Sequence, residues 1–198
     1  MPKQLRLILP ETTYHCYSRC HGLLKLLLHQ DAKTALVDAI KMCQEKYKFE
    51  LIAAEIVDNH FHFVIRTLKD GAPIDCIMQY IKARTAEKYN KATGRKGAFW
   101  NERYKCKIVE HSTNPQRYLR QLLWYIAYNP VKKGLSRNPR NNYIGFIRCY
   151  LRRNYQLSTI KITLHHFFYE LGNSFVERVR KFLSYEKEYV QRRLVVYS

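Results

Sequence analysis

The chain has 198 residues, of which 35 are Lys or Arg and 16 are Asp or Glu, so its formal net charge is +19. A hydrophobic fraction of 46%, with only 7 Gly and 6 Pro, excludes a disordered, collagen-like or Pro-rich chain. No stretch approaches the roughly 20 uninterrupted apolar residues of a membrane span, and the opening residues do not resemble a secretory signal. We therefore expect a globular intracellular protein with no membrane partner, whose positive charge serves an anionic partner.

The six cysteines are scattered without Cys-x-x-Cys pairs, a pattern that indicates reduced thiols rather than a disulfide framework. His15, Cys16, Cys20 and His21 come closest to a metal-binding cluster. Structural zinc sites usually take their ligands from paired hairpins, which this segment lacks, so we interpret these side chains as structural.

The predicted elements begin with a strand at residues 12–19, where aromatic and β-branched residues gather. Apolar residues at helical spacing then predict an amphipathic helix over residues 31–48. Two short apolar runs, residues 51–57 and 60–66, are separated by an Asp-Asn turn signal. This part of the chain therefore predicts a strand, a helix and a hairpin.

A second helix is expected over residues 74–89, followed by a fourth strand over residues 99–110. A third helix begins at a cap within residues 112–114. It should end at Asn129, because Pro130 disfavours helical geometry in the residue before it.

The order βαββαβα predicts an α+β, ferredoxin-like domain in which an antiparallel sheet carries helices on one face. We assign residues 1–137 to this domain. After a loop rich in Asn and Pro, residues 138–198 are expected to form a mainly helical, basic C-terminal extension. Helical spacing in the extension is clearest over residues 174–194.

Basic residues alternate with aromatic residues between Lys82 and Lys107, where nine basic residues accompany two acidic ones. Such a segment suits a groove that neutralises phosphates and stacks unpaired bases, although a solvated helix face beside core aromatics has the same pattern. The charge of the whole chain favours nucleic acid as the partner. The candidate DNA-contacting residues are Arg19, Lys82, Arg84, Lys88, Arg103 and Lys105.

The segment from Asn59 to Ile65 alternates histidine with apolar residues. On a strand, residues two apart share a face, so His60 and His62 project together while Phe61 and Phe63 enter the core. Two neighbouring imidazoles can chelate a metal, but a polar face of an edge strand would show the same pattern.

The third predicted helix presents Tyr125 at the border of its apolar stripe, with Asn129 one turn later on nearly the same line. A tyrosine hydroxyl can act as a nucleophile when a metal or a base assists it. Tyr118 and Tyr128 on the same helix are possible substitutes, and spacing alone does not choose among the three.

Four segments carry a resemblance to a known family: YHCYSR at residues 14–19, NHFH at 59–62, FWNERY at 99–104, and YIAYNPV at 125–131 with Gly134-Leu135 after it. In this order they resemble the motifs of single-tyrosine HUH transposases, most closely the REP-associated tyrosine transposases. The resemblance covers about residues 12–136.

This resemblance implies an enzyme that cleaves and rejoins single-stranded or hairpin DNA through a 5′-phosphotyrosine intermediate, as in DNA transposition. It implies His60 and His62 as paired ligands of a divalent metal, magnesium or manganese, with Asn129 as a polar third ligand and Tyr125 as the nucleophile. No nucleotide cofactor is expected, because the sequence has no Walker-type phosphate loop. Such an enzyme would be cytoplasmic and nucleoid-associated, as a monomer or a homodimer.

The sequence departs from the family pattern at Asp58, where Pro is common, and at Cys20-His21, where an Arg-Gly ending is usual. These departures concern DNA contacts and loop shape rather than the metal and nucleophile positions. Two alternatives stay open. One is a ferredoxin-like module that binds single-stranded DNA or RNA without chemistry, and the other is a metal-dependent nuclease that uses water.

Overall fold

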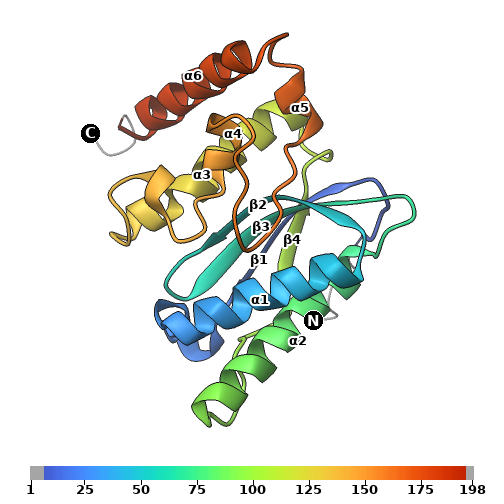
Figure 1. Ribbon diagram of the computed structural model, residues 1–198, viewed down its shortest axis with the longest axis vertical. Helices are drawn as coiled ribbons and strands as arrows, with labels where there is room; N and C mark the ends of the chain where they lie inside the picture. Colours follow the sequence, from blue (N-terminus) through green and yellow to red (C-terminus); the bar gives the residue numbers. More distant parts are fainter. Residues whose placement is uncertain (1–6, 195–198) are drawn as a thin grey trace.

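The computed structural model describes residues 7–194 and contains a four-stranded antiparallel sheet with strand order β2-β3-β1-β4 (Figure 1). The strands are β1 (Thr13–Arg19), β2 (Phe49–Ile56), β3 (His60–Thr67) and β4 (Lys105–Ile108). The helices are α1 (Gln30–Lys46), α2 (Ile74–Thr93), α3 (Pro115–Lys132), α4 (Ile147–Leu151), α5 (His166–Tyr169) and α6 (Phe175–Leu194), with short 3₁₀ turns at His21–Leu23, Leu26–Leu28 and Pro139–Asn141.

The fold class predicted from the sequence is confirmed, since β1-α1-β2-β3-α2-β4 is the ferredoxin-like order. Helices α1 and α2 lie side by side on one face of the sheet, over a core that includes Phe61, Phe63 and Ile65 (Figure 1). The arrangement differs from the expectation in one respect. Helix α3 and the extension after it lie on the opposite face, the face that carries His60 and His62 (Figure 1).

The predicted strand over residues 99–110 is much longer than β4. Phe99 and Trp100 turn into the core, where the Trp100 ring meets the edge of the Phe61 ring at 5.2 Å. The chain touches the sheet there through a single bridge to Cys20 and returns to regular pairing at Lys105. Burial of the two aromatic side chains therefore overrides strand pairing in this segment.

The expected end of the third helix at Asn129 is wrong by one turn, because α3 continues through Pro130 to Lys132. Proline has a helical φ and lacks only the N–H, so a helix can pass through it where other hydrogen bonds hold the turn. Here the Lys133 amide donates to the Asn129 carbonyl. The Asn142 side chain donates to the Ala127 carbonyl at 2.7 Å.

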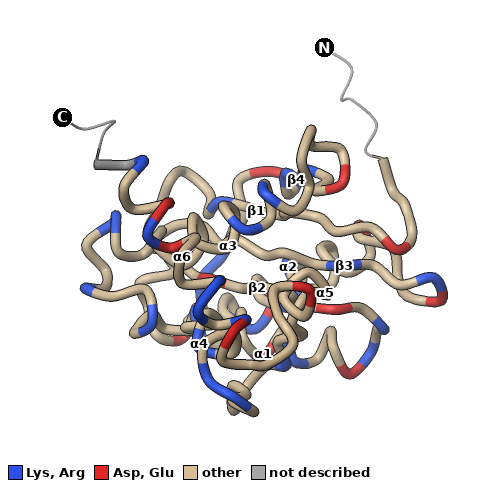
Figure 2. Tube along the Cα trace, turned by 90° about the horizontal axis from the view of Figure 1, so that it is seen from above, with Lys and Arg blue, Asp and Glu red and all other residues tan. Residues whose placement is uncertain are grey.

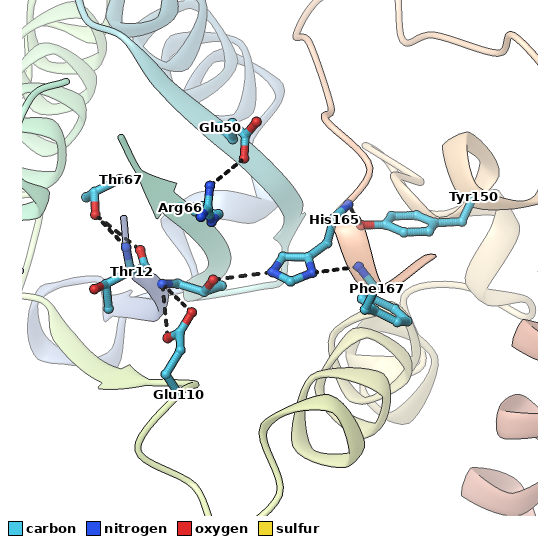
Figure 3. Close-up of polar contacts among 9 residues, drawn as sticks. Thr12, Glu50, Arg66, Thr67, Glu110, Tyr150, His165 and Phe167 are labelled. Atoms are coloured by element: carbon cyan, nitrogen blue, oxygen red, sulfur yellow. Dashed lines mark hydrogen bonds and ion pairs between the residues drawn. The ribbon is translucent and has the colours of Figure 1, made fainter. Parts of the chain in front are cut away.

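The extension is fastened to the sheet and to α3 by buried groups. His165 lies beside Thr13 of β1, with Nε2 and Oγ1 3.4 Å apart. The Tyr150 hydroxyl accepts from the His165 amide (Figure 3). On the α3 side, the Trp124 ring stacks on Phe182 of α6 with a centroid distance of 4.9 Å. Residues 7–137 and the extension thus share one hydrophobic core.

The division of the chain after residue 137 stays a prediction, and its outer ends, residues 1–6 and 195–198, lie outside the described residues. Within residues 7–194, no helix combines the length and the apolar character needed to cross a membrane. Lys and Arg are spread around the molecule rather than gathered on one side (Figure 2).

We predict that Glu55→Gln makes the free energy of unfolding less dependent on pH. Glu55 is fully buried on β2 and accepts from Asn142 at 3.1 Å, and its burial raises the pKa of the carboxyl to about 8. Because the folded-state pKa lies above the unfolded value, this group stabilises the fold below about pH 4.5, and the contribution is lost as the pH rises towards 8.

Relative to Glu55→Gln, the native chain should lose up to about 1.4 kcal/mol per pH unit across that window. Urea unfolding of both proteins between pH 5 and pH 8 measures the difference. Parallel pH profiles would contradict a protonated Glu55 in the folded state.

Candidate active site

Strand β3 places His60 and His62 on the same face of the sheet, as the alternating pattern predicts. Their rings meet edge to face with a centroid distance of 5.0 Å, and both side chains are buried. Phe61 and Phe63 lie fully buried behind them and stack on each other. The apolar half of the strand thus fixes the position of the two imidazoles.

Each of these imidazoles has a partner on its Nδ1 atom. The Nδ1 of His60 lies 2.9 Å from Oδ1 of Asn59, and the Nδ1 of His62 lies 3.0 Å from Nε2 of His15 on β1. The Nε2 atom of His62 is buried and has no hydrogen-bond partner within the described part of the chain. A buried nitrogen without a partner is costly unless a ligand meets it.

Burial keeps all three imidazoles uncharged at neutral pH. It lowers the pKa of His15 and of His60 to about 4. Lys107 adds to the shift of His15, whereas at His60 the carboxylate of Asp58 opposes the shift and Arg19 adds to it. The pKa of His62 also falls well below its usual range, first because of burial and then because of His15 and His60. Neutral imidazole is the form that binds a metal.

Helix α3 brings Tyr125 to the histidine pair. The Tyr125 ring meets the His62 ring edge to face at a centroid distance of 5.5 Å, and both residues belong to one subunit. The Lys132 ammonium lies 4.7 Å from the centroid of the same tyrosine ring. Tyr125 therefore stands between the imidazoles and a cation.

The other two tyrosines that the sequence left open on α3 have different surroundings. Tyr118 lines the same cleft as Tyr125, and burial raises the pKa of its hydroxyl. Tyr128 donates to Glu186 of α6 at 2.9 Å, and burial together with that carboxylate raises its pKa to about 12. Tyr128 thus belongs to the contact between α3 and α6 rather than to the cleft.

Asn129 is buried on α3, one turn after Tyr125, as its spacing predicts. In residues 7–194 it is not part of the cleft lining, and no group of three or more His, Cys, Asp or Glu is arranged to hold a metal. A metal on His60 and His62 would therefore need a further ligand of another kind, such as a side-chain amide, water or a ligand oxygen.

A cleft of about 920 Å³ opens between the histidine face of the sheet, α3 and α6. Five of its lining side chains are cationic, namely Arg19, Lys107, Arg117, Arg120 and Arg192, against the single carboxylate of Glu188. The aromatic lining consists of Tyr17, Tyr118, Tyr125, Tyr185 and Tyr189. Cations beside half-buried aromatic rings suit a single strand, whose phosphates and bases both need partners.

The six basic residues proposed from the sequence fall into two groups. Arg19 lines the cleft, and with Arg103 and Lys105 it also lines an adjoining hollow of about 200 Å³. Lys82, Arg84 and Lys88 lie on α2, across the sheet from the cleft.

The three basic residues on α2 also have partners within the chain. Lys82 donates to the Glu102 carbonyl. Arg84 pairs with Glu87 and Lys88 with Asp38, each at 2.7 Å. The structure does not bring these three residues together with His60, His62 and Tyr125, and their contact with DNA stays a prediction.

Several residues of the cleft were not predicted from the sequence. His15 and Tyr17 alternate with the predicted Arg19 along β1, so period 2 places all three on one face. On α6, Tyr185, Glu188, Tyr189 and Arg192 follow helical spacing, and Arg117, Arg120 and Gln121 do so on α3. These spacings are visible in the sequence. Which surface each set of residues faces, however, depends on how α3 and α6 pack.

A known family matches the part of the chain that carries His60, His62 and Tyr125. The model of the family described as "Transposase IS200 like" matches residues 10–126, more than half of the chain. The chain belongs to the IS200-like transposase family. No curated protein matches it.

A solved structure shows the same fold for this transposase. The chain resembles the structure of a REP-associated tyrosine transposase bound to a REP hairpin, with a TM-score of 0.62 and 19% identity over 83% of this chain and 100% of that one. A proposed transposase from Deinococcus radiodurans R1 gives a TM-score of 0.41 and 18% identity over 61% of this chain and 93% of that one. The second TM-score is too low to support a conclusion.

Proposed function

We propose that this transposase cleaves and rejoins single-stranded or hairpin DNA with Tyr125 as the nucleophile. The observation that carries the proposal is the contact between Tyr125 and His62, which lie 5.5 Å apart by ring centroids within one subunit and one cleft. A nucleophile in a basic cleft beside two neutral imidazoles is the arrangement that metal-assisted phosphoryl transfer requires.

The residues of the cleft fit a divalent metal, magnesium or manganese. His60 and His62 are neutral, adjacent and buried, and the Nε2 atom of His62 lacks a partner among the described residues. Asn129, one turn beyond Tyr125, is our proposed third protein ligand. When bound, the metal would act as a Lewis acid that draws charge from the phosphate oxygens.

In the proposed step, the Tyr125 hydroxyl oxygen attacks the scissile phosphorus in line. The bond from phosphorus to the DNA 3′-oxygen breaks, and a bond from phosphorus to the tyrosine oxygen forms. The phenol proton is lost to solvent and the 3′-oxygen takes one up, which leaves a 5′-phosphotyrosine and a free 3′-hydroxyl. Because the phosphodiester is kept, a 3′-hydroxyl can reverse the step and join two strands without a nucleotide cofactor.

The cations of the cleft would hold the strand rather than cut it. Arg117 and Arg120 lie on α3, on the same wall as Tyr125, and the Arg120 guanidinium lies 4.2 Å from the centroid of the Tyr185 ring of α6. Both helices thus offer charge and ring faces to one groove. The likeness to a protein bound to a REP hairpin supports hairpin DNA as the first substrate to test.

We predict that Tyr125→Phe abolishes the covalent protein–DNA adduct, because Tyr125 is the α3 tyrosine whose ring meets the His62 ring edge to face. Tyr17 of β1 also lies near His62, at 5.7 Å between ring centroids, but its ring is tilted against the imidazole. The adduct formed on a single-stranded hairpin with Mn²⁺ is measured on denaturing gels. Tyr128→Phe is the matched control from the same helix, and it should keep the adduct because Tyr128 is bonded to Glu186.

An adduct that survives in Tyr125→Phe and disappears in Tyr118→Phe would assign the nucleophile to Tyr118 instead. Cleavage without any adduct in the native chain would favour a nuclease that uses water. Tight binding without cleavage would favour a binding module.

We also predict that Arg117→Ala with Arg120→Ala weakens binding to the hairpin and reduces its dependence on salt. Each lost phosphate contact should lower the slope of log affinity against log salt by about 0.7. The control removes two exposed cations, Lys41 and Lys91, from α1 and α2 across the sheet. Equal slopes for the two double variants, measured by fluorescence anisotropy from low to high salt, would contradict a strand in the cleft.

A further inference from the structure

His15 is a buried residue of β1 that the mechanism above does not use. Its Nε2 atom lies 3.0 Å from Nδ1 of His62, and the two rings stack at a centroid distance of 5.2 Å with an interplanar angle of 28°. It projects from the same sheet face as His62, since it pairs with Val64, which lies two residues beyond His62 on β3. A contact this close between two neutral imidazoles must be a hydrogen bond in which one nitrogen carries the proton.

The bond allows two arrangements of protons. If His15 donates, the Nε2 atom of His62 carries a hydrogen and cannot bind a metal. If His62 donates from Nδ1, its Nε2 atom presents a lone pair and His15 carries its own hydrogen on Nδ1. Both of these atoms are buried without a hydrogen-bond partner within residues 7–194. The contact with His15 therefore decides whether His62 can be a ligand.

His60 shows which of the two proton arrangements would give the histidine pair matching lone pairs. The Nδ2 group of Asn59 donates to the Leu23 carbonyl at 3.4 Å, so the Oδ1 atom of Asn59 faces His60. An amide oxygen only accepts, and His60 must therefore carry its hydrogen on Nδ1 and a lone pair on Nε2. His62 offers a matching lone pair when it too carries its hydrogen on Nδ1.

We propose that His15 is a positioning residue whose Nε2 atom accepts from Nδ1 of His62 and so holds the Nε2 lone pair of His62 ready for a divalent metal. This inference rests on the proposed function for the identity of the ligand. Outer partners of this kind fix the ring orientation and tautomer of a metal-binding histidine, and their loss typically lowers metal affinity by about 10- to 100-fold.

The test begins with the tautomer of His62 in the full chain without metal or DNA, read from ¹⁵N chemical shifts and long-range ¹H–¹⁵N correlations. The native chain should show the Nδ1–H form. His15→Leu removes the acceptor and should give a mixture of the two forms, whereas His15→Gln keeps an acceptor near the position of Nε2 and should restore the Nδ1–H form. This readout does not depend on whether the protein cleaves DNA.

Mn²⁺ affinity, measured by calorimetry on the same proteins, gives the second readout. His15→Leu should bind Mn²⁺ about 10- to 100-fold more weakly, with His15→Gln recovering most of the loss. His165→Leu is the matched control, because His165 is also a buried histidine against the sheet but contacts Thr13. It should leave the His62 tautomer and the Mn²⁺ affinity unchanged.

The proposal is overturned if His62 keeps the Nδ1–H form and full Mn²⁺ affinity in His15→Leu, or shows the Nε2–H form in the native chain. Equal losses in His15→Leu, His15→Gln and His165→Leu would show a structural role only, which also overturns it. If the tautomers behave as expected but no DNA adduct forms, the positioning role stands and the proposed reaction fails.

Discussion

Trp124 of α3 is fully buried, and its ring stacks on Phe182 of α6. This contact determines where the next residue, Tyr125, can lie. Because α3 is held between α6 and the sheet, Tyr125 is directed at the face that carries His60 and His62. One turn further on, Glu186 of α6 accepts from Tyr128 of α3 and from Arg140 of the 3₁₀ turn that follows α3. The active site thus depends on the C-terminal extension, which supplies no proposed catalytic group.

The second feature of the site is that its three imidazoles, those of His15, His60 and His62, are uncharged although cationic side chains lie nearby. Burial is the largest cause that disfavours a charged imidazole. Cations near His60 and His15 act in the same direction, and Asp58 opposes them at His60. The histidines can therefore be buried without the cost of an unpaired charge, and their lone pairs stay available. Arg117, Arg120 and the other cations of the cleft remain near solvent, where phosphates can reach them.

Much of the fold could be predicted from local patterns. Period 2 placed His60 and His62 together, and period 3.6 placed Tyr125 and Asn129 one turn apart, because both periodicities are properties of the backbone. The sequence could not show that α3 lies across the sheet from α1 and α2, since that position depends on a contact between residues 124 and 182. For the same reason, the wall that α6 adds to the cleft was not foreseen.

The candidate DNA contacts on α2 illustrate the same limit. A run of basic residues predicts an electrostatic surface, but Lys88 meets Asp38 fifty residues away in the chain, on the neighbouring helix. Pro130 is a different case. A proline usually ends a helix at the residue before it, but here hydrogen bonds around the turn keep α3 helical to Lys132. Local rules were most reliable where one strand or helix positions a residue by itself.

The central claim is that Tyr125 and the histidine pair of one subunit form a complete site. Mixing Tyr125→Phe with His62→Ala tests it most directly, because each variant alone lacks one half of the site. If the site is complete within one subunit, the mixture forms no more DNA adduct than either variant does separately. If two subunits shared the site, the mixture would recover about a quarter of the native adduct, all of it on the His62→Ala chain. That recovery would contradict the account.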